Sequence, residues 1–329
     1  MSIASRSSRS QWPEQGPIVV LGRGHSGTRF LAEALQRQGV FIGANLNPMF
    51  DAEAWAPVIQ EVVLGIYPRY DLLVDGDIWH RKVEETAAAF LREGYTGGPW
   101  GWKIGITAFI IPLLARVFPN LRIIHLVRDG RDVMLSRLSR VIRMAIRPFN
   151  RKIILGDADA QSWFGIPITK RSINRYRNEF EMLTWVQFVA AARRYGQPLG
   201  PQRYVELRYE DMCLDPVPSV GKVFEFAGLK MTASVADFLK ANAQTDRISK
   251  WKALPPRKIA GAISIGKLLL DELGYTEPAE VSPVDATAES PRASCRASGP
   301  RRRDDPHTGA AAGFYGRARR LVSWVQSRS

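Results

Sequence analysis

Cysteine and histidine are scarce in this sequence of 329 residues, which holds only two cysteines and four histidines. Cys213 and Cys295 are too few for a disulfide framework, and no cysteine–histidine cluster exists that could bind a structural zinc ion. The sequence therefore predicts neither a disulfide-stabilised secreted domain nor a metal site.

Long apolar runs are also missing. No run reaches the roughly 18 residues that a membrane span needs, and the first ten residues, MSIASRSSRS, lack the apolar stretch of a signal peptide. We therefore expect a cytoplasmic location. The remaining composition, 45% hydrophobic and 24% charged, is typical of a globular protein.

Positive charge is in excess, but it is unevenly distributed. Of the net charge of +14, residues 291–329 contribute +7 through nine arginines and two aspartates, so residues 1–290 carry the other +7. A moderately basic body fits an enzyme for a phosphorylated ligand better than a dedicated nucleic-acid binder. We expect no specific nucleic-acid partner.

Short apolar segments alternate with helical patterns along the chain. The expected strands are 18–21, 40–42, 100–105, 121–127 and 204–209. The expected helices are 28–38, 52–64, 80–93, 108–118, 172–195, 217–227, 233–242 and 256–273. This alternation predicts an α/β fold of three layers, with a mostly parallel sheet between helices and ligands bound beyond the carboxyl ends of its strands.

Composition divides the chain into four parts: a flexible N-terminus (1–16), one folded domain (17–275), a disordered segment (276–312) and a basic amphipathic helix (313–329). The last helix could make weak contact with an anionic membrane surface through residues 314–328. Docking on its own domain, or disorder, explains the same pattern.

A glycine-rich turn follows the first strand with the spacing Gly22-x4-Gly27, which is that of a phosphate-binding loop. Thr28 and Arg29 then stand where a nucleoside-triphosphate site needs lysine and Ser/Thr, so the clamp on the β/γ-phosphates and a magnesium ligand are missing. Positive charge comes instead from Arg23, His25 and Arg29. The turn is therefore expected to hold an anion without a metal, although an ordinary turn between strand and helix has the same pattern.

A second motif follows the most apolar strand. Arg128 comes directly after Leu121–Val127, Asp129 stands at the expected helix N-cap, and Ser136 lies eight residues after the arginine. An arginine at the carboxyl end of a strand, with a serine in the next helix, can grip a second phosphate.

Together the two motifs resemble those of the PAPS-dependent sulfotransferases. In that family a [Lys/Arg]-Ser-Gly-Thr loop binds the 5′-phosphosulfate and an Arg-x7-Ser motif binds the 3′-phosphate; here they are 25–28 and 128–136. The segments Tyr209-Glu210-Asp211 and Lys250-Trp251 are similar to two further family motifs, and all four occur in order between about residues 17 and 275.

The resemblance implies a P-loop-like fold and a metal-free, in-line transfer of a sulfuryl group from PAPS to a hydroxyl or amine, with PAP as the product. The donor-binding residues that it implies are Arg23, Gly24, His25, Ser26, Gly27, Thr28, Arg29, Arg128, Ser136, Tyr209, Lys250 and Trp251. The acceptor is expected to be a small molecule, a carbohydrate or a lipid.

His25 departs from the family pattern, because cytosolic members have lysine at this position to assist the bridging oxygen as the sulfuryl group leaves. A protonated imidazole could do the same, since phosphate charge favours its charged form. Arg23, Arg29 or Lys103, at the end of the 100–104 strand, could share the task.

The general base is also not where cytosolic members have it, because no histidine follows two residues after Lys103. Other branches use a carboxylate downstream of the first helix, and the sequence offers Asp51 and Glu53 there. We prefer Asp51, then Glu53, although Asp51 could simply cap a helix and Glu53 could lie in its first turn.

Several questions stay open on sequence alone. Aromatic residues of segments 45–100 and 140–170, among them Trp55, Trp79, Trp163 and Phe164, could wall the acceptor pocket and would suit sugars, lipids and phenols alike. His125, in the middle of an apolar strand, is expected in the core. A P-loop small-molecule kinase and a non-catalytic nucleotide-binding protein are the alternative functions.

Overall fold

A computed structural model describes residues 12–73, 77–136, 152–153, 162–163, 166–167 and 169–275. The expectations for segments 276–312 and 313–329, for most of 1–16 and for Phe164 lie outside these residues.

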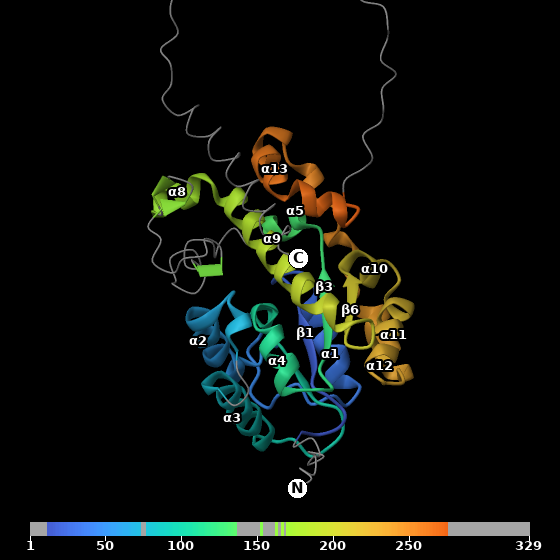
Figure 1. The fold of residues 1–329 in the computed structure, drawn as a ribbon. Coiled ribbons are helices and arrows are strands. Elements are labelled where there is room, and N and C mark those ends of the chain that lie inside the picture. The colour runs from blue at the N-terminus through green and yellow to red at the C-terminus, as the bar shows by residue number, and fades with distance from the viewer. Residues whose placement is uncertain are drawn as a thin grey trace, which may run out of the picture.

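A parallel four-stranded sheet forms the centre of the molecule, as predicted (Figure 1). Its strands, in spatial order, are β2 (Gly101–Lys103), β1 (Ile18–Leu21), β3 (Arg122–Val127) and β6 (Tyr204–Arg208), and every neighbouring pair is parallel. The strand predicted at 40–42 is wrong: Phe41 forms only an isolated bridge with Trp100, because the Val40 N–H donates back to the carbonyl oxygen of Leu35 instead of to the sheet. A separate antiparallel pair consists of β4 (Ser162–Trp163) and β5 (Ile166–Pro167).

Alternating side chains of β1 fill two cores, one on each face of the sheet. Ile18 and Val20 belong to the core that helices α1, α11 and α12 cover, whereas Val19 and Leu21 belong to the opposite core. The helices of the first layer are α1 (Thr28–Arg37), α10 (Tyr209–Leu214), α11 (Pro216–Phe226) and α12 (Ala233–Asn242). This is the arrangement of helix, sheet and helix layers that the sequence predicts.

The opposite layer is larger and is centred on α9, which packs against α5 and α13 (Figure 1). Its helices are α2 (Ala56–Ile66), α3 (Ile78–Arg92), α4 (Ile111–Val117), α5 (Gly130–Ser136), α9 (Arg177–Gly196) and α13 (Pro256–Glu272). Trp55 is fully buried there and stacks on Trp102 with ring centroids 3.8 Å apart, so the prediction that Trp55 walls an acceptor pocket is wrong.

Short elements connect the layers. The helix predicted over 172–195 is two helices, because α8 (Lys170–Arg175) ends at Tyr176 before α9 begins. The 3-10 helices are η1 (Glu53–Trp55), η2 (Tyr70–Leu72), η3 (Gly105–Phe109), η4 (Gln197–Leu199), η5 (Thr245–Arg247) and η6 (Lys250–Ala253). Among the described residues, none of the helices has both the length and the apolar character needed to cross a membrane.

His125 lies in the core, which confirms the sequence prediction. Its side chain is 1% exposed, and Nδ1 lies 2.8 Å from the Tyr204 hydroxyl and 3.5 Å from the Glu206 carboxylate. Burial lowers the pKa of His125 and thus favours the neutral imidazole.

The tight pairing of β2 with β1 predicts that Gly101→Ala destabilises the fold. A Cβ at this position would lie 1.8 Å from the Ile18 carbonyl oxygen, so the strands would have to separate, at a cost of about 2 kcal/mol or more. Chemical denaturation measures the change in the free energy of unfolding.

Gly221→Ala is the matched control, because Gly221 lies within α11 and an added Cβ meets nothing within 4 Å. Alanine is the better helix former, so this variant should gain roughly 0.5–1 kcal/mol. Equal effects of the two substitutions would contradict the strand pairing described here.

Candidate functional site

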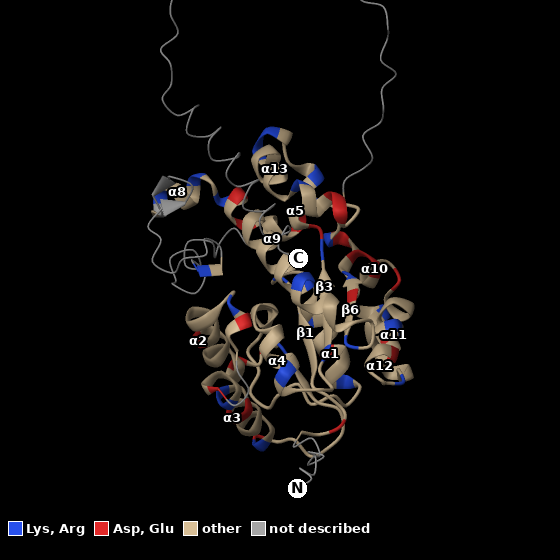
Figure 2. Cartoon of the chain, viewed as in Figure 1, with Lys and Arg blue, Asp and Glu red and all other residues tan. Residues whose placement is uncertain are grey.

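A cleft of about 840 Å³ lies beyond the carboxyl ends of β1, β2 and β3, where the topology predicts a ligand site. Its basic lining residues are Arg23, His25, Arg29, Lys103, Arg128 and Arg247, and its acidic ones are Glu33 and Asp51. The cleft is thus an electropositive site, whereas acidic and basic residues are interspersed over α3, α11 and α12 (Figure 2).

The glycine turn and α1 form one wall of this cleft. His25 and Gly27 have left-handed backbones, with φ of 73° and 84°, and Gly27 is the N-cap of α1. A Cβ on Gly27 would lie 2.6 Å from the Tyr209 ring, so glycine is required here. The first N–H groups of a helix have no acceptor within it, and the positive end of the helix dipole lies at the same place, so the turn can hold an anion.

Ser26 supplies a buried polar group to this turn. Its side chain is 1% exposed, and its hydroxyl has no hydrogen-bond partner among the residues that the structure describes. A buried hydroxyl normally has a partner. Ser26 is not among the residues that line the cleft, unlike its neighbours His25 and Gly27.

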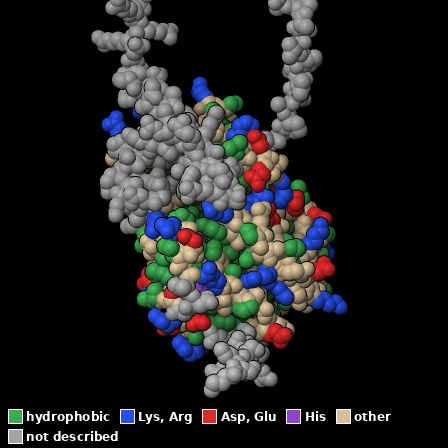
Figure 3. All heavy atoms as spheres, viewed as in Figure 1, with side chains coloured by type: hydrophobic (Ala, Val, Ile, Leu, Met, Phe, Trp, Pro, Cys, Tyr) green, Lys and Arg blue, Asp and Glu red, His purple; other side chains and the backbone are tan. Residues whose placement is uncertain are grey.

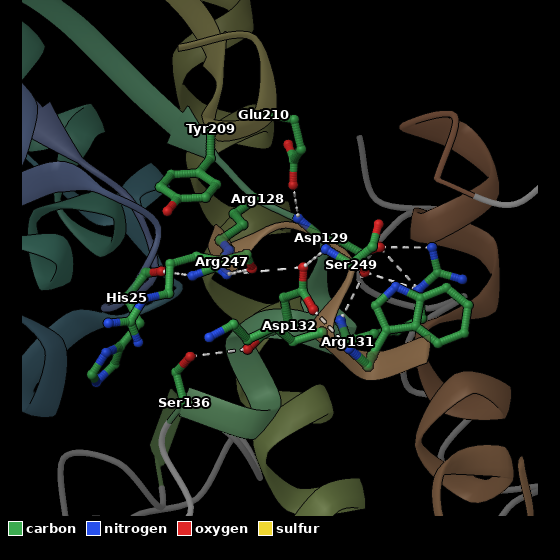
Figure 4. Close-up of polar contacts among 12 residues, drawn as sticks. His25, Arg128, Asp129, Arg131, Asp132, Ser136, Tyr209, Glu210, Arg247 and Ser249 are labelled. Carbon is green, nitrogen blue, oxygen red and sulfur yellow. Dashed lines mark hydrogen bonds and ion pairs between the residues drawn. The ribbon is translucent and has the colours of Figure 1, made fainter. Parts of the chain in front are cut away.

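Arg128 lies at the centre of the site (Figure 4). Its guanidinium donates to two carbonyl oxygens, that of His25 at 2.7 Å and that of Arg247 at 2.5 Å, and its carbon lies 4.3 Å from the centre of the Tyr209 ring. Its Nε is buried without a partner in the described residues. Arg128 therefore joins three segments and keeps a donor for a further oxygen.

Ser136 also lines the cleft, so both ends of the Arg-x7-Ser motif reach the same site. The Ser136 hydroxyl donates to the carbonyl oxygen of Asp132 at 3.2 Å, one turn back in α5. Asp129 accepts from the backbone N–H of Arg131 at 2.9 Å, which confirms the predicted N-cap.

Arg23 lies deeper and is paired. Its Nη2 is 2.8 Å from the Glu181 carboxylate of α9, and both side chains are 3% exposed or less. Burial lowers the pKa of Arg23, while the charge of Glu181 opposes this shift. The arginine thus fastens the glycine turn to α9 rather than offering an uncompensated charge.

Asp51 and Lys103 form a second ion pair at the cleft. Lys103 Nζ lies 2.8 Å from Asp51 Oδ1 and donates to the Met49 carbonyl at 2.8 Å. Asp51 is not a helix cap, because the N-cap of η1 is Ala52. The carboxylate is therefore held at the wall of the cleft by the lysine.

Glu53 is placed differently. It is exposed, does not line the cleft and accepts a hydrogen bond from the Asn47 amide at 3.0 Å. It lies in the first turn of η1, which was the simple structural role considered for it. Of the two candidate bases, only Asp51 lines the cleft.

The remaining predicted donor ligands divide into two groups. Gly24, His25, Gly27, Thr28, Arg29 and Tyr209 line the cleft. Lys250 and Trp251 do not: Lys250 is exposed near Asp246, and Trp251 packs on the guanidinium of Arg131 at 3.8 Å. Burial raises the pKa of Tyr209, which therefore keeps its phenolic proton.

Sequence reasoning missed Arg247 and Glu181. Arg247 lines the cleft three residues before Lys250, so the sequence indicated this loop but not this arginine. Glu181 follows Phe180 within a buried helix, and an acidic residue among apolar ones was the available signal.

Within the described residues, no three His, Cys, Asp or Glu side chains are grouped as metal ligands.

Comparison with known proteins agrees with this geometry. The profile of the Sulfotransferase family matches residues 17–233, and the chain belongs to this family. Carbohydrate sulfotransferase 3 of Mus musculus is 28% identical over 171 residues, which are 47% of this chain and 34% of that protein. Carbohydrate sulfotransferase 5 of Mus musculus is 30% identical over 130 residues, which are 40% of this chain and 30% of that protein.

The chain thus spans about a third of the length of these curated relatives. Among solved structures, the sulfotransferase domain from the curacin biosynthetic pathway superposes with a TM-score of 0.49 at 16% identity, covering 81% of this chain and 100% of that one. The chain is thus a member of the Sulfotransferase family with an α/β fold, and the family match gives no support to the kinase considered as an alternative.

The buried ion pair of Arg23 predicts that Glu181→Ala is strongly destabilising. The substitution leaves the guanidinium buried without its carboxylate, and breaking such a pair costs about 3–5 kcal/mol. Thermal or chemical unfolding measures this loss.

Glu61→Ala is the matched control, because Glu61 forms an exposed ion pair with Lys82 at 2.6 Å. Exposed pairs contribute about 0–1 kcal/mol, so this variant should unfold much like the wild type. A loss at Glu181 no larger than that at Glu61 would show that the Arg23 pair does not hold the turn.

Proposed function

We propose that the protein transfers a sulfuryl group from PAPS to a hydroxyl of a carbohydrate acceptor. The observation that carries this proposal is the presence of two separate anion-binding groups in one cleft: the glycine turn at the N-terminus of α1, and Arg128 with Ser136. Membership of the sulfotransferase family supplies the reaction class.

The charge distribution of the donor fits these two groups. PAPS carries a 5′-phosphosulfate and a 3′-phosphate on opposite sides of its ribose, whereas ATP carries all its phosphates in one chain. We assign the 5′-phosphosulfate to the turn 24–28, where N–H groups and a helix dipole favour an anion. We assign the 3′-phosphate to Arg128 and Ser136, with Arg247 beside them.

In the proposed reaction the acceptor oxygen attacks sulfur in line with the bond that breaks. A new S–O bond forms to the acceptor, the S–O bond to the 5′-phosphate breaks, and the hydroxyl proton passes to the Asp51 carboxylate. The phosphate oxygen of PAP keeps the electron pair. Its charge is stabilised by the N-terminus of α1 and by His25, whose side chain is exposed at the cleft.

Lys103 supports the base in this scheme. Its Nζ contacts Asp51 Oδ1. The other carboxylate oxygen, Oδ2, has only a long contact of 3.5 Å to the Asn47 amide nitrogen. Because Oδ2 is bonded more weakly, it is the better proton acceptor of the two oxygens. The ammonium charge also lies on the side of the cleft where negative charge develops.

A carbohydrate acceptor is supported by the names of the relatives and by the lining of the cleft. Both relatives are named carbohydrate sulfotransferases. The side chains of Met49, Ile106 and Phe188 give the cleft apolar surface beside its charged groups, and the viewed face of the molecule likewise mixes hydrophobic and basic side chains (Figure 3). A cytoplasmic location and weak membrane contact through 314–328 stay predictions of the sequence.

The donor assignment predicts that PAP raises the melting temperature of the wild type and that ATP with magnesium does not. Arg128→Ala should weaken PAP binding at least roughly 30-fold, because a buried guanidinium–phosphate contact is lost. Calorimetric titration gives the affinities, and each variant's own unliganded melting temperature serves as its baseline.

Arg92→Ala is the control for this measurement, since Arg92 is exposed in the last turn of α3 and lies outside the cleft lining. Its affinity for PAP should be that of the wild type. Stabilisation by ATP with magnesium alone would refute the donor assignment.

The base assignment predicts different outcomes for two carboxylates that are two residues apart. Asp51→Asn should lower kcat by roughly 10²–10⁴-fold while PAP affinity is retained, because no carboxylate is then left to accept the proton of the acceptor hydroxyl. Glu53→Gln should leave kcat within about threefold of the wild type, since Glu53 does not line the cleft. Sulfuryl transfer from labelled PAPS measures both, and the reverse ranking would make Glu53 the base.

A further inference from the structure

The loop 245–253, which comprises η5 and η6, lies against the end of the cleft that Arg128 occupies. Only Arg247 of this loop contributes to the cleft lining, and its carbonyl oxygen accepts from the Arg128 guanidinium at 2.5 Å. The position of the Arg247 side chain therefore depends on what holds the loop.

The loop is held by Asp132 of α5 (Figure 4). Asp132 Oδ2 accepts from the backbone N–H of Ser249 at 2.7 Å, and Oδ1 accepts from that of Trp251 at 3.0 Å. One carboxylate thus binds two amides that are two residues apart. Its side chain is 1% exposed, so the carboxylate is buried between α5 and the loop.

The loop conformation needs such a restraint. Ser249 has a left-handed backbone with φ of 59°, which is unfavourable for a residue other than glycine and persists only where the surroundings impose it. The bond from its N–H to Asp132 lies at this residue. The carboxylate is thus placed where the backbone is strained.

Neighbouring residues reinforce the same contact. The Arg131 guanidinium lies 3.8 Å from the Trp251 ring centre and is fixed by two hydrogen bonds to Asp129 from its Nε and Nη2. Burial raises the pKa of Asp132, whereas the two amides and Arg128 favour its charged form. The two hydrogen bonds from the loop amides therefore also stabilise the ionised form of the Asp132 carboxylate that accepts them.

We propose that Asp132 is a positioning residue that sets the place of Arg247 at the 3′-phosphate end of the cleft, a role that rests on the donor assignment above. Asp132 itself is not among the residues that line the cleft. Its two bonds fix the backbone from 249 to 251, and this in turn fixes Arg247, whose carbonyl is bound by Arg128. The affinity for PAP thus depends on the Asp132 carboxylate, although a carboxylate that faced the phosphates of PAP would repel them.

The test is a double-variant cycle on PAP binding, measured by calorimetric titration of the full chain. Asp132→Asn keeps the size of the side chain but replaces one carboxylate oxygen with a donor, so it cannot accept from both amides. We expect this variant to weaken PAP binding about 10-fold and Arg247→Ala to weaken it at least as much. Lys258→Ala, exposed on α13 and outside the cleft lining, should change the affinity less than threefold.

The double variant decides the question. If Asp132 acts through Arg247, Asp132→Asn adds no further loss once Arg247 is alanine, and the double variant binds as Arg247→Ala does. If the two losses multiply, Asp132 acts independently of Arg247 and the proposal is overturned. Under saturating acceptor, the KM for PAPS should rise in Asp132→Asn while kcat stays within about threefold, which general unfolding would not produce.

Three further outcomes are distinguishable. If Asp132→Asn is too unstable to titrate, Asp132→Glu, which keeps the charge and displaces the carboxylate by one methylene, is examined in the same cycle with the same expectation. If the wild type binds PAP but neither single substitution weakens it, the positioning role fails alone. If the wild type does not bind PAP at all, the donor assignment fails and the positioning role fails with it.

Discussion

The site depends on one buried arginine that no carboxylate contacts closely. Arg128 is 4% exposed, and its nearest acidic partner, Asp132, is 3.9 Å away. Its guanidinium donates hydrogen bonds to the carbonyl oxygens of His25 and Arg247 and lies over the face of the Tyr209 ring. A buried cation held mainly by neutral groups retains a net attraction for an anion, and it also fixes the three segments that surround that anion.

Other cations of the site are balanced, and this difference separates their roles. Arg23 is paired with Glu181, Lys103 with Asp51 and Arg131 with Asp129. Each pair connects a wall of the cleft to the body of the protein or holds a loop in shape. Positive charge for the ligand thus comes from Arg128, from the N-terminus of α1 and from the exposed Arg29, whereas the exposed Arg247 also lies 3.3 Å from the Asp246 carboxylate. The proposed chemistry follows from this division between charges that hold the structure and charges that face the ligand.

Sequence reasoning succeeded where the signal is local. The apolar runs of β1 and β3, the glycine spacing at 22–27 and the pair Arg128–Ser136 each lie within a few residues, and the alternation of strands and helices gave the parallel sheet. It failed at short or long-range features. The run 40–42 is apolar, but its Val40 N–H bonds back to Leu35 and only Phe41 bridges to the sheet, and the apolar Trp55 stacks in the core rather than at the cleft. The pairing of Arg23 with Glu181 joins residues 158 positions apart, and the contact of Asp132 with Ser249 joins residues 117 apart. No periodicity or motif indicates such pairs, because they exist only once the helices are packed.

The central claim is that the cleft recognises two anionic groups of one nucleotide, and the affinity of the wild-type protein for PAP against 5′-AMP tests it most directly. The two ligands differ only in the 3′-phosphate, which is assigned to Arg128 and its neighbours. Calorimetric titration at a fixed ionic strength should show PAP binding at least about 100-fold more tightly, as expected for one or more charge-assisted contacts to a buried guanidinium. Equal affinities would contradict the account, because Arg128 would then have no phosphate to bind.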